Sequence, residues 1–399
     1  MKALSDLVML DLTHMLAGPF GAMLLADLGA TTIKIEPPGR GEATRRLLEN
    51  DPKHSLNGVG AYFLTLNRNK KSVAIDLKQK EGLALFYALV RKADIVFTNF
   101  GPGVTAKLGI DHDTLAQHNP RIITCAVSGF GESGPGRQRP AFDLVAQGYG
   151  GGMSITGFEG GAPTKAGIPI GDLGGGIFGA LGILAALHAR ERTGRGQHVD
   201  ISMQDCQISM LTYMATMHFL SGEEIGLTGN GHFRHIPYNT YPTRDRHIIL
   251  ACVTDQAWTN LAGVLNDPVL SDPALNDQPA RAAKRDEIEA RLAEILKTDG
   301  CDAWLTRFAA ADVPAAPVND FAHALSDPQA RARHMVVSVP QPEGGAALMP
   351  GNPVKLSETG DESFTAAPVL GQHTDEVLRT LAGKSDAELA ELRARAIIQ

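Results

Sequence analysis

The strongest constraint on the fold is the alternation of short β-like runs with helical runs up to about residue 130. This pattern is typical of a largely parallel sheet whose faces are covered by helices. Helices are expected at Pro19 to Leu28 and Glu81 to Lys92. The expected strands are Val8 to Leu12, Thr31 to Ile35, Ser72 to Ile75, Asp94 to Thr98 and Arg121 to Val127. The sequence therefore predicts a Rossmann-like α/β fold.

The length of the chain favours two domains, because 399 residues exceed the usual size of a single core. The pattern changes after Gly226, where a loop with several histidines leads to a strand-like run at His247 to Val253 and then to helices, including one at Ala280 to Lys297. We expect a large Rossmann-like domain with a linker helix over 1–224 and a small α+β domain over 225–325. Residues 326–399 are expected to return to the large domain.

Composition narrows the classes of partner and the compartment. The formal charge of −7 gives no electrostatic footprint for nucleic acid. Charged residues interrupt the apolar stretch from Val8 to Ala30, so we read it as a strand and a helix, and predict neither a signal peptide nor a membrane partner. The cysteines form no C-x-x-C pair, which fits a reducing cytoplasm: Cys125, Cys206, Cys252 and Cys301.

A glycine-rich stretch surrounds one acidic residue, Asp172, ahead of a helix expected from about Leu173 to Arg192. At the N-cap, this carboxylate would accept hydrogen bonds from free backbone N–H groups and stay ionised. An ionised carboxylate beside such donors can act as a nucleophile, and the same donors can stabilise an oxyanion. Spacing alone favours a mere helix cap. The glycines fit either close approach of a ligand or tight helix packing.

Other catalytic motifs are missing from the sequence. It contains no G-x-S-x-G nucleophile elbow, no G-x-G-x-x-G fingerprint that opens a helix, and no P-loop. The H-x-x-H pair of His232 and His235 has no carboxylate or cysteine at ligand spacing, so we predict no metal site.

An ordered series of short segments points to one protein family. The segments are Leu10–His14, Ala17–Pro19, Leu28–Ala30, Ile33–Glu36, Asn67–Ser72, Asn99–Gly103, Phe142–Gln147, Gly171–Asp172, Thr193–Gln197 and Leu370–Thr374. Each is short, but their number and order are specific. Together they resemble the class III CoA-transferases, or CaiB/BaiF family, across nearly the whole chain.

The resemblance implies an acyl-CoA:carboxylate CoA-transferase in which Asp172 is the nucleophile. Asp172 would attack the thioester to give a mixed anhydride, and the CoA thiolate would convert this to an aspartyl-CoA thioester that serves the acceptor acid. The partners implied are acyl-CoA and a carboxylic acid. CoA enters as a thioester substrate, and no tightly bound cofactor or metal is implied. The resemblance also implies a homodimer of two interlocked rings.

The resemblance further assigns the CoA contacts, and we expect a second group of residues to form the substrate pocket. CoA contacts would fall on Leu16, Ala17, Ile75, Asp76, Leu77, Lys78, Asn99, Phe100, Gly101 and Lys107. The substrate pocket would be formed by Phe142, Gly229, Asn230, Gly231, Arg234, His235, Tyr238 and Arg244. The arginines and the histidine of this second group favour a dicarboxylic acid such as succinate, mesaconate, itaconate or a substituted glutarate.

Residues that differ from those of related enzymes help to decide between alternative functions. Leu16 and Phe142 replace the glutamine and tyrosine of formyl-CoA transferases, which argues against formyl-CoA and oxalate. An isomerase similar to the α-methylacyl-CoA racemases is disfavoured, because those enzymes carry a histidine base at the position of Phe142 and phenylalanine cannot transfer a proton. A non-enzymatic acyl-CoA binding protein is the other alternative, and the intact Gly171–Asp172 segment argues against it.

Overall fold

The computed structural model describes residues 2–399 of the chain, which divide into two compact units. Unit 1 contains the residues up to Gly152 together with Lys165–Thr216 and Arg331–Gln399. Unit 2 contains Met153–Thr164 and Met217–Ala330. Residues 153–164, expected in the large domain, therefore belong to unit 2.

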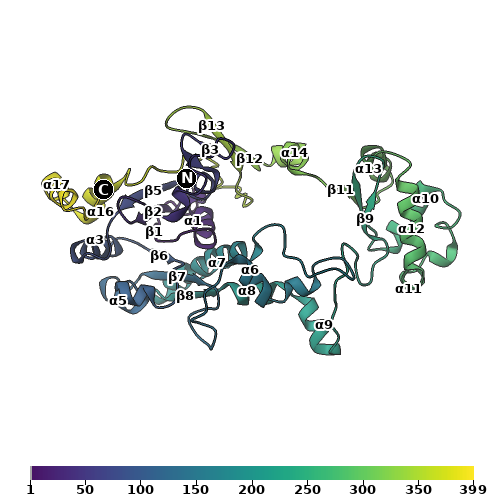
Figure 1. Cartoon of the computed structure of the whole chain (residues 1–399), viewed down its shortest axis with the longest axis horizontal. Helices are drawn as coiled ribbons and strands as arrows, with labels where there is room; N and C mark the ends of the chain where they lie inside the picture. The colour runs from purple at the N-terminus through teal and green to yellow at the C-terminus, as the bar shows by residue number, and fades with distance from the viewer. Residues whose placement is uncertain (1) are drawn as a thin grey trace. The chain divides into compact units, whose positions relative to one another are not determined.

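Unit 1 is built on a six-stranded parallel sheet (Figure 1). The spatial order is β5-β2-β1-β6-β7-β8, so successive strands are added outward from β1 on one side and from β6 on the other. This is the order of the Rossmann folds, in which ligands bind where the direction reverses. The expected α/β fold with a parallel sheet is confirmed. Its strands are β1 (Val8–Asp11), β2 (Thr31–Glu36), β5 (Lys70–Ala74), β6 (Ile95–Thr98), β7 (Ile123–Ser128) and β8 (His198–Ser202), of which β8 was not predicted.

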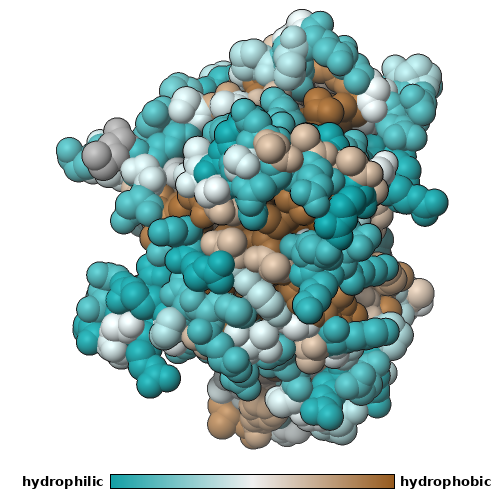
Figure 2. Space-filling model, turned by 90° about the vertical axis from the view of Figure 1, so that its left-hand side faces the viewer, coloured by the Kyte–Doolittle hydropathy of each residue, from teal (hydrophilic) through white to brown (hydrophobic). Residues whose placement is uncertain are grey.

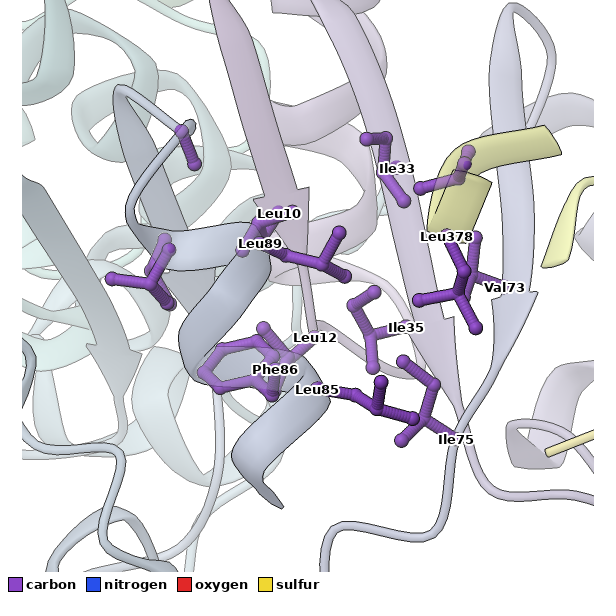
Figure 3. Packing of buried hydrophobic residues seen from close by; sticks show 14 of the residues in the cluster. Leu10, Leu12, Ile33, Ile35, Val73, Ile75, Leu85, Phe86, Leu89 and Leu378 are labelled. Atoms are coloured by element: carbon purple, nitrogen blue, oxygen red, sulfur yellow. The ribbon is translucent and has the colours of Figure 1, made fainter. Parts of the chain in front are cut away.

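Helices cover both faces of this sheet. On one face, Leu10 and Ile33 pack in a core with Phe86, and Leu378 reaches the same core from near the end of the chain (Figure 3). On the other face, Met9 and residues of neighbouring strands pack chiefly against α1 and α7. In β1 and β6, alternate residues thus enter different cores, as the pleat requires. The covering helices are α1 (Ala17–Asp27), α3 (Lys80–Val90), α5 (His112–His118), α7 (Ile170–Thr193), α16 (Thr374–Ala382) and α17 (Asp386–Ala394).

The glycines at the start of α7 allow close packing. A Cβ atom at Gly176 would lie 2.5 Å from the carbonyl oxygen of Ala17, and one at Gly21 would lie 2.6 Å from that of Gly176. A Cβ at Gly175 would lie 2.9 Å from the side chain of Val127. Of the two explanations left open by the sequence, these contacts support close approach of α1, α7 and the sheet, rather than of a ligand.

Helix α7 is also long and apolar. By length and composition it would suffice to cross a membrane, but half of its most apolar stretch is buried inside the protein. Such burial is what a core helix of this type shows. On the face of the molecule in Figure 2, hydrophilic residues cover most of the surface and hydrophobic ones show between them.

Unit 2 has a small antiparallel sheet in the order β11-β10-β9. Its core includes Trp258, Leu292 and Trp304. The helix predicted at 280–297 is two helices, because Lys284 leaves the helical region with φ −112° and ψ 26°. The elements are β9 (Tyr238–Pro242), β10 (His247–Ala251), β11 (Ala315–Pro317), α10 (Asp255–Leu265), α11 (Gln278–Ala283), α12 (Arg285–Leu296) and α13 (Cys301–Ala310).

Shorter elements complete the described chain. The remaining α-helices are α2 (Ala61–Leu66), α4 (Val104–Leu108), α6 (Asp143–Tyr149), α8 (Met203–Met210), α9 (Tyr213–Ser221), α14 (Phe321–Ser326) and α15 (Pro328–Ala332). The remaining strands are β3 (Ser55–Leu56), β4 (Val59–Gly60), β12 (Val336–Pro340) and β13 (Ala346–Pro350).

Candidate active site

A pocket of about 320 Å³ lies in unit 1 where the strand order reverses. The loops after β1, β6 and β7 supply part of its wall, and the first turn of α7 supplies Asp172. Parallel strands bring their carboxyl ends, and hence these loops, to one edge of the sheet. Seven residues predicted from the sequence line the pocket together: Leu16, Ala17, Asn99, Phe100, Gly101, Phe142 and Asp172.

The position of Asp172 in its helix differs from the prediction. Helix α7 begins at Ile170 with Pro169 as N-cap, so Asp172 is the third helical residue and does not cap the helix. The cap comes from Asp143 of α6. Its Oδ1 atom accepts hydrogen bonds from the backbone N–H of Gly171 at 2.8 Å and of Asp172 at 3.3 Å.

The backbone N–H groups of this first turn already have acceptors. Besides the two bonds to Asp143, the N–H of Ile170 donates to the Ile168 carbonyl at 2.8 Å and that of Leu173 to the Pro169 carbonyl at 2.9 Å. The expectation that these donors hold the Asp172 carboxylate, or an oxyanion, is therefore wrong. The side chain of Asp172 is left facing the pocket.

The side-chain amides of two glutamines hold Asp143 and the first turn of α7 in place. Gln147, one turn further along α6, donates from Nε2 to Asp143 Oδ2 at 2.7 Å, and its Oε1 accepts from the backbone N–H of Ala166 at 2.9 Å. From α8, Gln207 donates to the Ile170 carbonyl at 3.1 Å. Both oxygens of Asp143 are thus occupied, which holds the start of α7 in one position.

The electrostatic setting of Asp172 also differs from that of a capping residue. Burial, together with the nearby negative charge of Asp143, raises the pKa of Asp172 to about 6. Both effects disfavour the charged form. The carboxylate therefore predominates at pH 7, and its basicity exceeds that of an ordinary aspartate.

The side chain of Asn99 joins two walls of the pocket through hydrogen bonds to the backbone of His14. Asn99 Oδ1 accepts from the backbone N–H of His14 at 2.8 Å, and Asn99 Nδ2 donates to the His14 carbonyl at 2.7 Å. The loop after β6 thereby holds the loop after β1. Because its oxygen and its amino group each make one of these bonds, Asn99 has less capacity to contact a ligand through its side chain than the sequence suggested.

The other predicted CoA contacts lie outside this pocket lining. Residues 75–78 connect β5 to α3, and Lys107 lies in α4, which follows β6. Both segments are at the same edge of the sheet as the pocket, because β5 and β6 are parallel to β1. Within this group Ile75 is buried, whereas Lys78 and Lys107 are exposed. Their assignment to CoA stays a prediction.

The predicted substrate residues from 229 to 244 belong to unit 2. Gly229 has a positive φ of 60°, and Asn230 donates to Thr240 Oγ1 at 2.8 Å. The backbone N–H groups of Arg234 and His235 both donate to His232 Nδ1, which orders the loop that precedes Tyr238 in β9. Gly231, another of these predicted residues, lies in the same loop.

Arg244 is not part of that loop. It lies beyond the opposite end of β9 and forms an ion pair with Asp299 at 3.5 Å. In contrast, the guanidinium of Arg234 makes no hydrogen bond or ion pair within residues 2–399. The two arginines predicted to act together are thus separated along a strand.

Several pocket residues were not identified from the sequence. Tyr62 of α2 lines the pocket, and burial together with Asp172 raises its pKa. Arg137 and Arg139 are exposed cations on the loop before α6. Arg137 also lines an adjoining hollow of about 320 Å³. The sequence could have pointed to Asp143 and Gln147. Both lie in a segment that resembles the family, and their spacing of four residues places them on the same side of a helix.

Comparison with known proteins identifies the family. The family described as CoA-transferase family III matches residues 4–374. Acetyl-CoA:oxalate CoA-transferase of Acetobacter aceti is 40% identical over 89% of each chain. Succinyl-CoA:mesaconate CoA-transferase of Haloarcula hispanica is 38% identical over 95% of this chain and 96% of the relative. A CaiB/BaiF family protein of Brucella suis has a similar structure, with a TM-score of 0.85, 34% identity and coverage of 95% and 99%.

The chain therefore belongs to the family III CoA-transferases, as the sequence segments indicated. Succinyl-CoA:glutarate CoA-transferase of Homo sapiens also matches, at 31% identity over the whole of this chain and 90% of the relative. The predicted enzyme class, a CoA-transferase, is confirmed.

The influence of Asp143 on Asp172 can be measured. Asp143→Asn removes the negative charge but keeps an oxygen that can accept from Gly171, so we expect the pKa of Asp172 to fall. At a pH between the two midpoints, Asp172 is more ionised in the variant than in the wild type. NMR titration of 13C-labelled aspartate carboxyls, with Asp172→Asn for assignment, measures this. Asp205→Asn, at the third position of α8, serves as control and leaves the midpoint unchanged. A midpoint that is unchanged or higher in Asp143→Asn would refute the coupling.

Proposed function

We propose that this protein transfers CoA from an acyl-CoA to a carboxylic acid with Asp172 as the covalent nucleophile. The observation that carries the proposal is the placement of Asp172. Among residues 2–399, it is the one carboxylate that lines the pocket where the strand order reverses. Family membership supplies the reaction class, and the raised pKa of Asp172 favours attack by a carboxylate that is ionised at pH 7.

The proposed reaction alternates between an anhydride and a thioester. A carboxylate oxygen of Asp172 attacks the thioester carbonyl, the C–S bond breaks, and CoA leaves as a thiolate. The thiolate attacks the aspartyl carbonyl of the mixed anhydride and releases the donor acid as a carboxylate. The acceptor carboxylate attacks the resulting aspartyl-CoA thioester and displaces the thiolate again. Finally, the thiolate attacks the acceptor's carbonyl, which yields the new acyl-CoA and regenerates Asp172.

The pocket walls suit an acyl-CoA. Arg137 and Arg139 are exposed at its rim and can meet phosphate oxygens. The adjoining hollow shares Phe100, Gly101 and Arg137 with the pocket and extends it for an elongated ligand. Phe142 lines the pocket at the position where an isomerase of the related racemase type needs a base. Transfer is therefore the better-supported reaction.

Replacement of the nucleophile gives the most direct test. We expect Asp172→Asn to lower transfer from succinyl-CoA by at least about a thousandfold, because the amide is a poor nucleophile, while CoA binding and thermal stability change little. Mass spectrometry of wild type incubated with succinyl-CoA should detect an adduct on Asp172 that hydroxylamine removes. Asp205→Asn again serves as the control.

Retention of transfer by folded Asp172→Asn, or an adduct on another residue, would disprove the assignment of the nucleophile. Measuring the mass of the acyl-CoA product also separates the alternatives. Transfer changes the acyl group, isomerisation does not, and a binding protein yields no product.

For the acceptor, we propose a dicarboxylic acid. The relatives are named for oxalate, mesaconate, glutarate, citramalate and malate, all of which carry two carboxyl groups. Arg234 is the partner predicted from the sequence for the second carboxylate, and its guanidinium makes no hydrogen bond or ion pair within residues 2–399. Because a relative named for oxalate is 40% identical, oxalate belongs in the substrate panel although Leu16 and Phe142 argue against it.

Arg234 and Arg244 form a matched pair for testing this preference. We expect Arg234→Ala to raise the KM for a dicarboxylate about tenfold or more and to leave that for acetate unchanged, since a charged hydrogen bond contributes about 1.5–3 kcal/mol. Arg244→Ala, which removes a cation already paired with Asp299, should behave like wild type. Equal use of mono- and dicarboxylates by both variants and wild type would contradict the proposal.

We also propose that the chain forms a homodimer. Apolar side chains of unit 1 are exposed on three neighbouring helices, including Leu144 of α6, Ile177 and Leu181 of α7, and Ile208 of α8. Ile177 and Leu181 lie one helical turn apart on one face. A surface with several exposed large apolar residues indicates an interface, and a second copy fits the expectation from the family.

Light scattering coupled to gel filtration tests the dimer. We expect a mass of about twice the 42.4 kDa of the chain. A charge introduced by Leu181→Glu should shift the population towards monomer, whereas Leu348→Glu, at an exposed leucine of β13, should not. A wild-type mass of one chain would refute this proposal and leave the nucleophile untouched.

A further inference from the structure

Three charged side chains are buried beneath the pocket, between neighbouring strands of the sheet. Asp11 of β1, Lys34 of β2 and Lys70 of β5 are 0%, 0% and 3% exposed. All three belong to segments that resemble the family, yet none of them lines the pocket. Buried ions carry a large desolvation cost, so their contacts call for an explanation.

Asp11 and Lys70 form an ion pair with each other. Lys70 Nζ lies 2.8 Å from Asp11 Oδ2 and also donates to Asn67 Oδ1 at 3.2 Å and to the Pro19 carbonyl at 3.3 Å. The second oxygen of Asp11 accepts from the backbone N–H and the hydroxyl of Thr13. The hydrogen bonds of the pair therefore join β1, β5 and the start of α1. Burial opposes ionisation of Asp11, but the charges of Lys70 and Lys34 lower its pKa.

Lys34 is the exception. Within residues 2–399 its ammonium makes a single hydrogen bond, to the carbonyl oxygen of Thr13 at 2.8 Å, and it forms no ion pair within 4.0 Å. An apolar side chain of similar length would avoid the desolvation cost of this cation. What the cation adds is a strong, charged donor to the backbone of the loop after β1.

That loop forms one wall of the pocket and is held at consecutive residues. Thr13 is bound through its N–H by Asp11 and through its carbonyl by Lys34, and His14 is clasped by Asn99. Met15 then adopts a positive φ of 63°, a conformation that non-glycine residues rarely take unless their surroundings impose it. Residues 14–17 all line the pocket.

We propose that Lys34 is a positioning residue for acyl-CoA: by holding the Thr13 carbonyl it fixes the loop of residues 14–17 in the conformation that receives the substrate beside Asp172. The inference rests on the proposed CoA-transferase function and names a residue that does not touch the ligand. Lys34 acts on binding through the backbone of another residue, so its loss should change affinity more than turnover.

The same cation influences a side chain in the pocket wall. Burial and the charge of Lys34 lower the pKa of His14, while Glu42 and Asp11 act in the opposite direction. The imidazole is therefore neutral at pH 7 and remains in the pocket wall without adding charge.

The chain offers a matched pair of lysines for the test. Lys34→Met keeps an unbranched side chain, one bond shorter than lysine, and leaves both partners of the Asp11–Lys70 pair in the chain. Lys71→Met is the control, because Lys71 is on the adjacent strand, directly beside Ile33, but its ammonium pairs with Glu376 at the surface. Three quantities are compared: the Kd of free CoA by titration calorimetry, KM and kcat for succinyl-CoA, and the hydrogen-exchange rate of the His14 amide.

For Lys34→Met we expect the Kd of CoA and the KM to rise about tenfold, as befits the loss of a charged hydrogen bond. kcat should stay within about threefold of wild type, and the His14 amide should exchange about tenfold faster, with the amides of β5 unchanged. Lys71→Met should match wild type in all three. If Lys34→Met fails to fold, Lys34→Gln, which is neutral and as long as methionine, should change the same quantities in the same direction but by less, because its amide can still donate to a carbonyl.

A folded variant that binds CoA with the wild-type Kd and protects the His14 amide normally would overturn the proposal, as would a fall in kcat at unchanged Kd and KM. The proposed function fails in a different way. Wild type that transfers no CoA to any acid would contradict the transferase assignment, whereas the exchange rate of the His14 amide would still decide whether Lys34 holds the loop.

Discussion

The geometry of unit 1 depends on the close contact between α1 and α7. Helix α1 starts directly after the loop that follows β1, and α7 is more than a hundred residues away in the sequence. Their backbones approach at Gly21 and Gly176, where a methyl group would meet a carbonyl oxygen of the opposite helix at 2.6 Å and 2.5 Å. This contact brings the first turn of α7 to the point where the strand order reverses. The pocket and Asp172 are placed together as a result.

At the first turn of α7, two different aspartates cap the helix and line the pocket. Asp143 accepts from the backbone N–H groups of Gly171 and Asp172, while the Asp172 carboxylate lines the pocket. A capping carboxylate gains hydrogen bonds to its charged form, which lower its pKa and weaken it as a nucleophile. Asp172 has instead a raised pKa, because it is partly buried beside a second negative charge. The arrangement suits covalent chemistry better than the cap that the sequence suggested.

Much of the parallel sheet was predictable, because its first five strands contain short β-like runs that alternate with helical ones. Strand β8 was missed because His198 and Asp200 make it half polar, although Gly194 ends α7 shortly before it. The family and the enzyme class were also predicted correctly from ordered motifs. In contrast, the capping role of Asp143 and the hold of Lys34 on Thr13 depend on contacts between distant segments. Local patterns carry no information about which carbonyl a buried lysine reaches.

The contribution of the C-terminal segment has a consequence for synthesis of the chain. Leu378 is buried in the same core as the strands of the first hundred residues (Figure 3), and Ile397 and Ile398 belong to that core as well. Ile398 forms a β-bridge with Ile75, and the backbone N–H of Asp76 donates to the Ile397 carbonyl at 2.9 Å. Until these residues have been synthesised, only the earlier helices, such as α3, cover this face of the sheet, and part of its core stays open. The large unit therefore completes this core only after most of the chain has emerged.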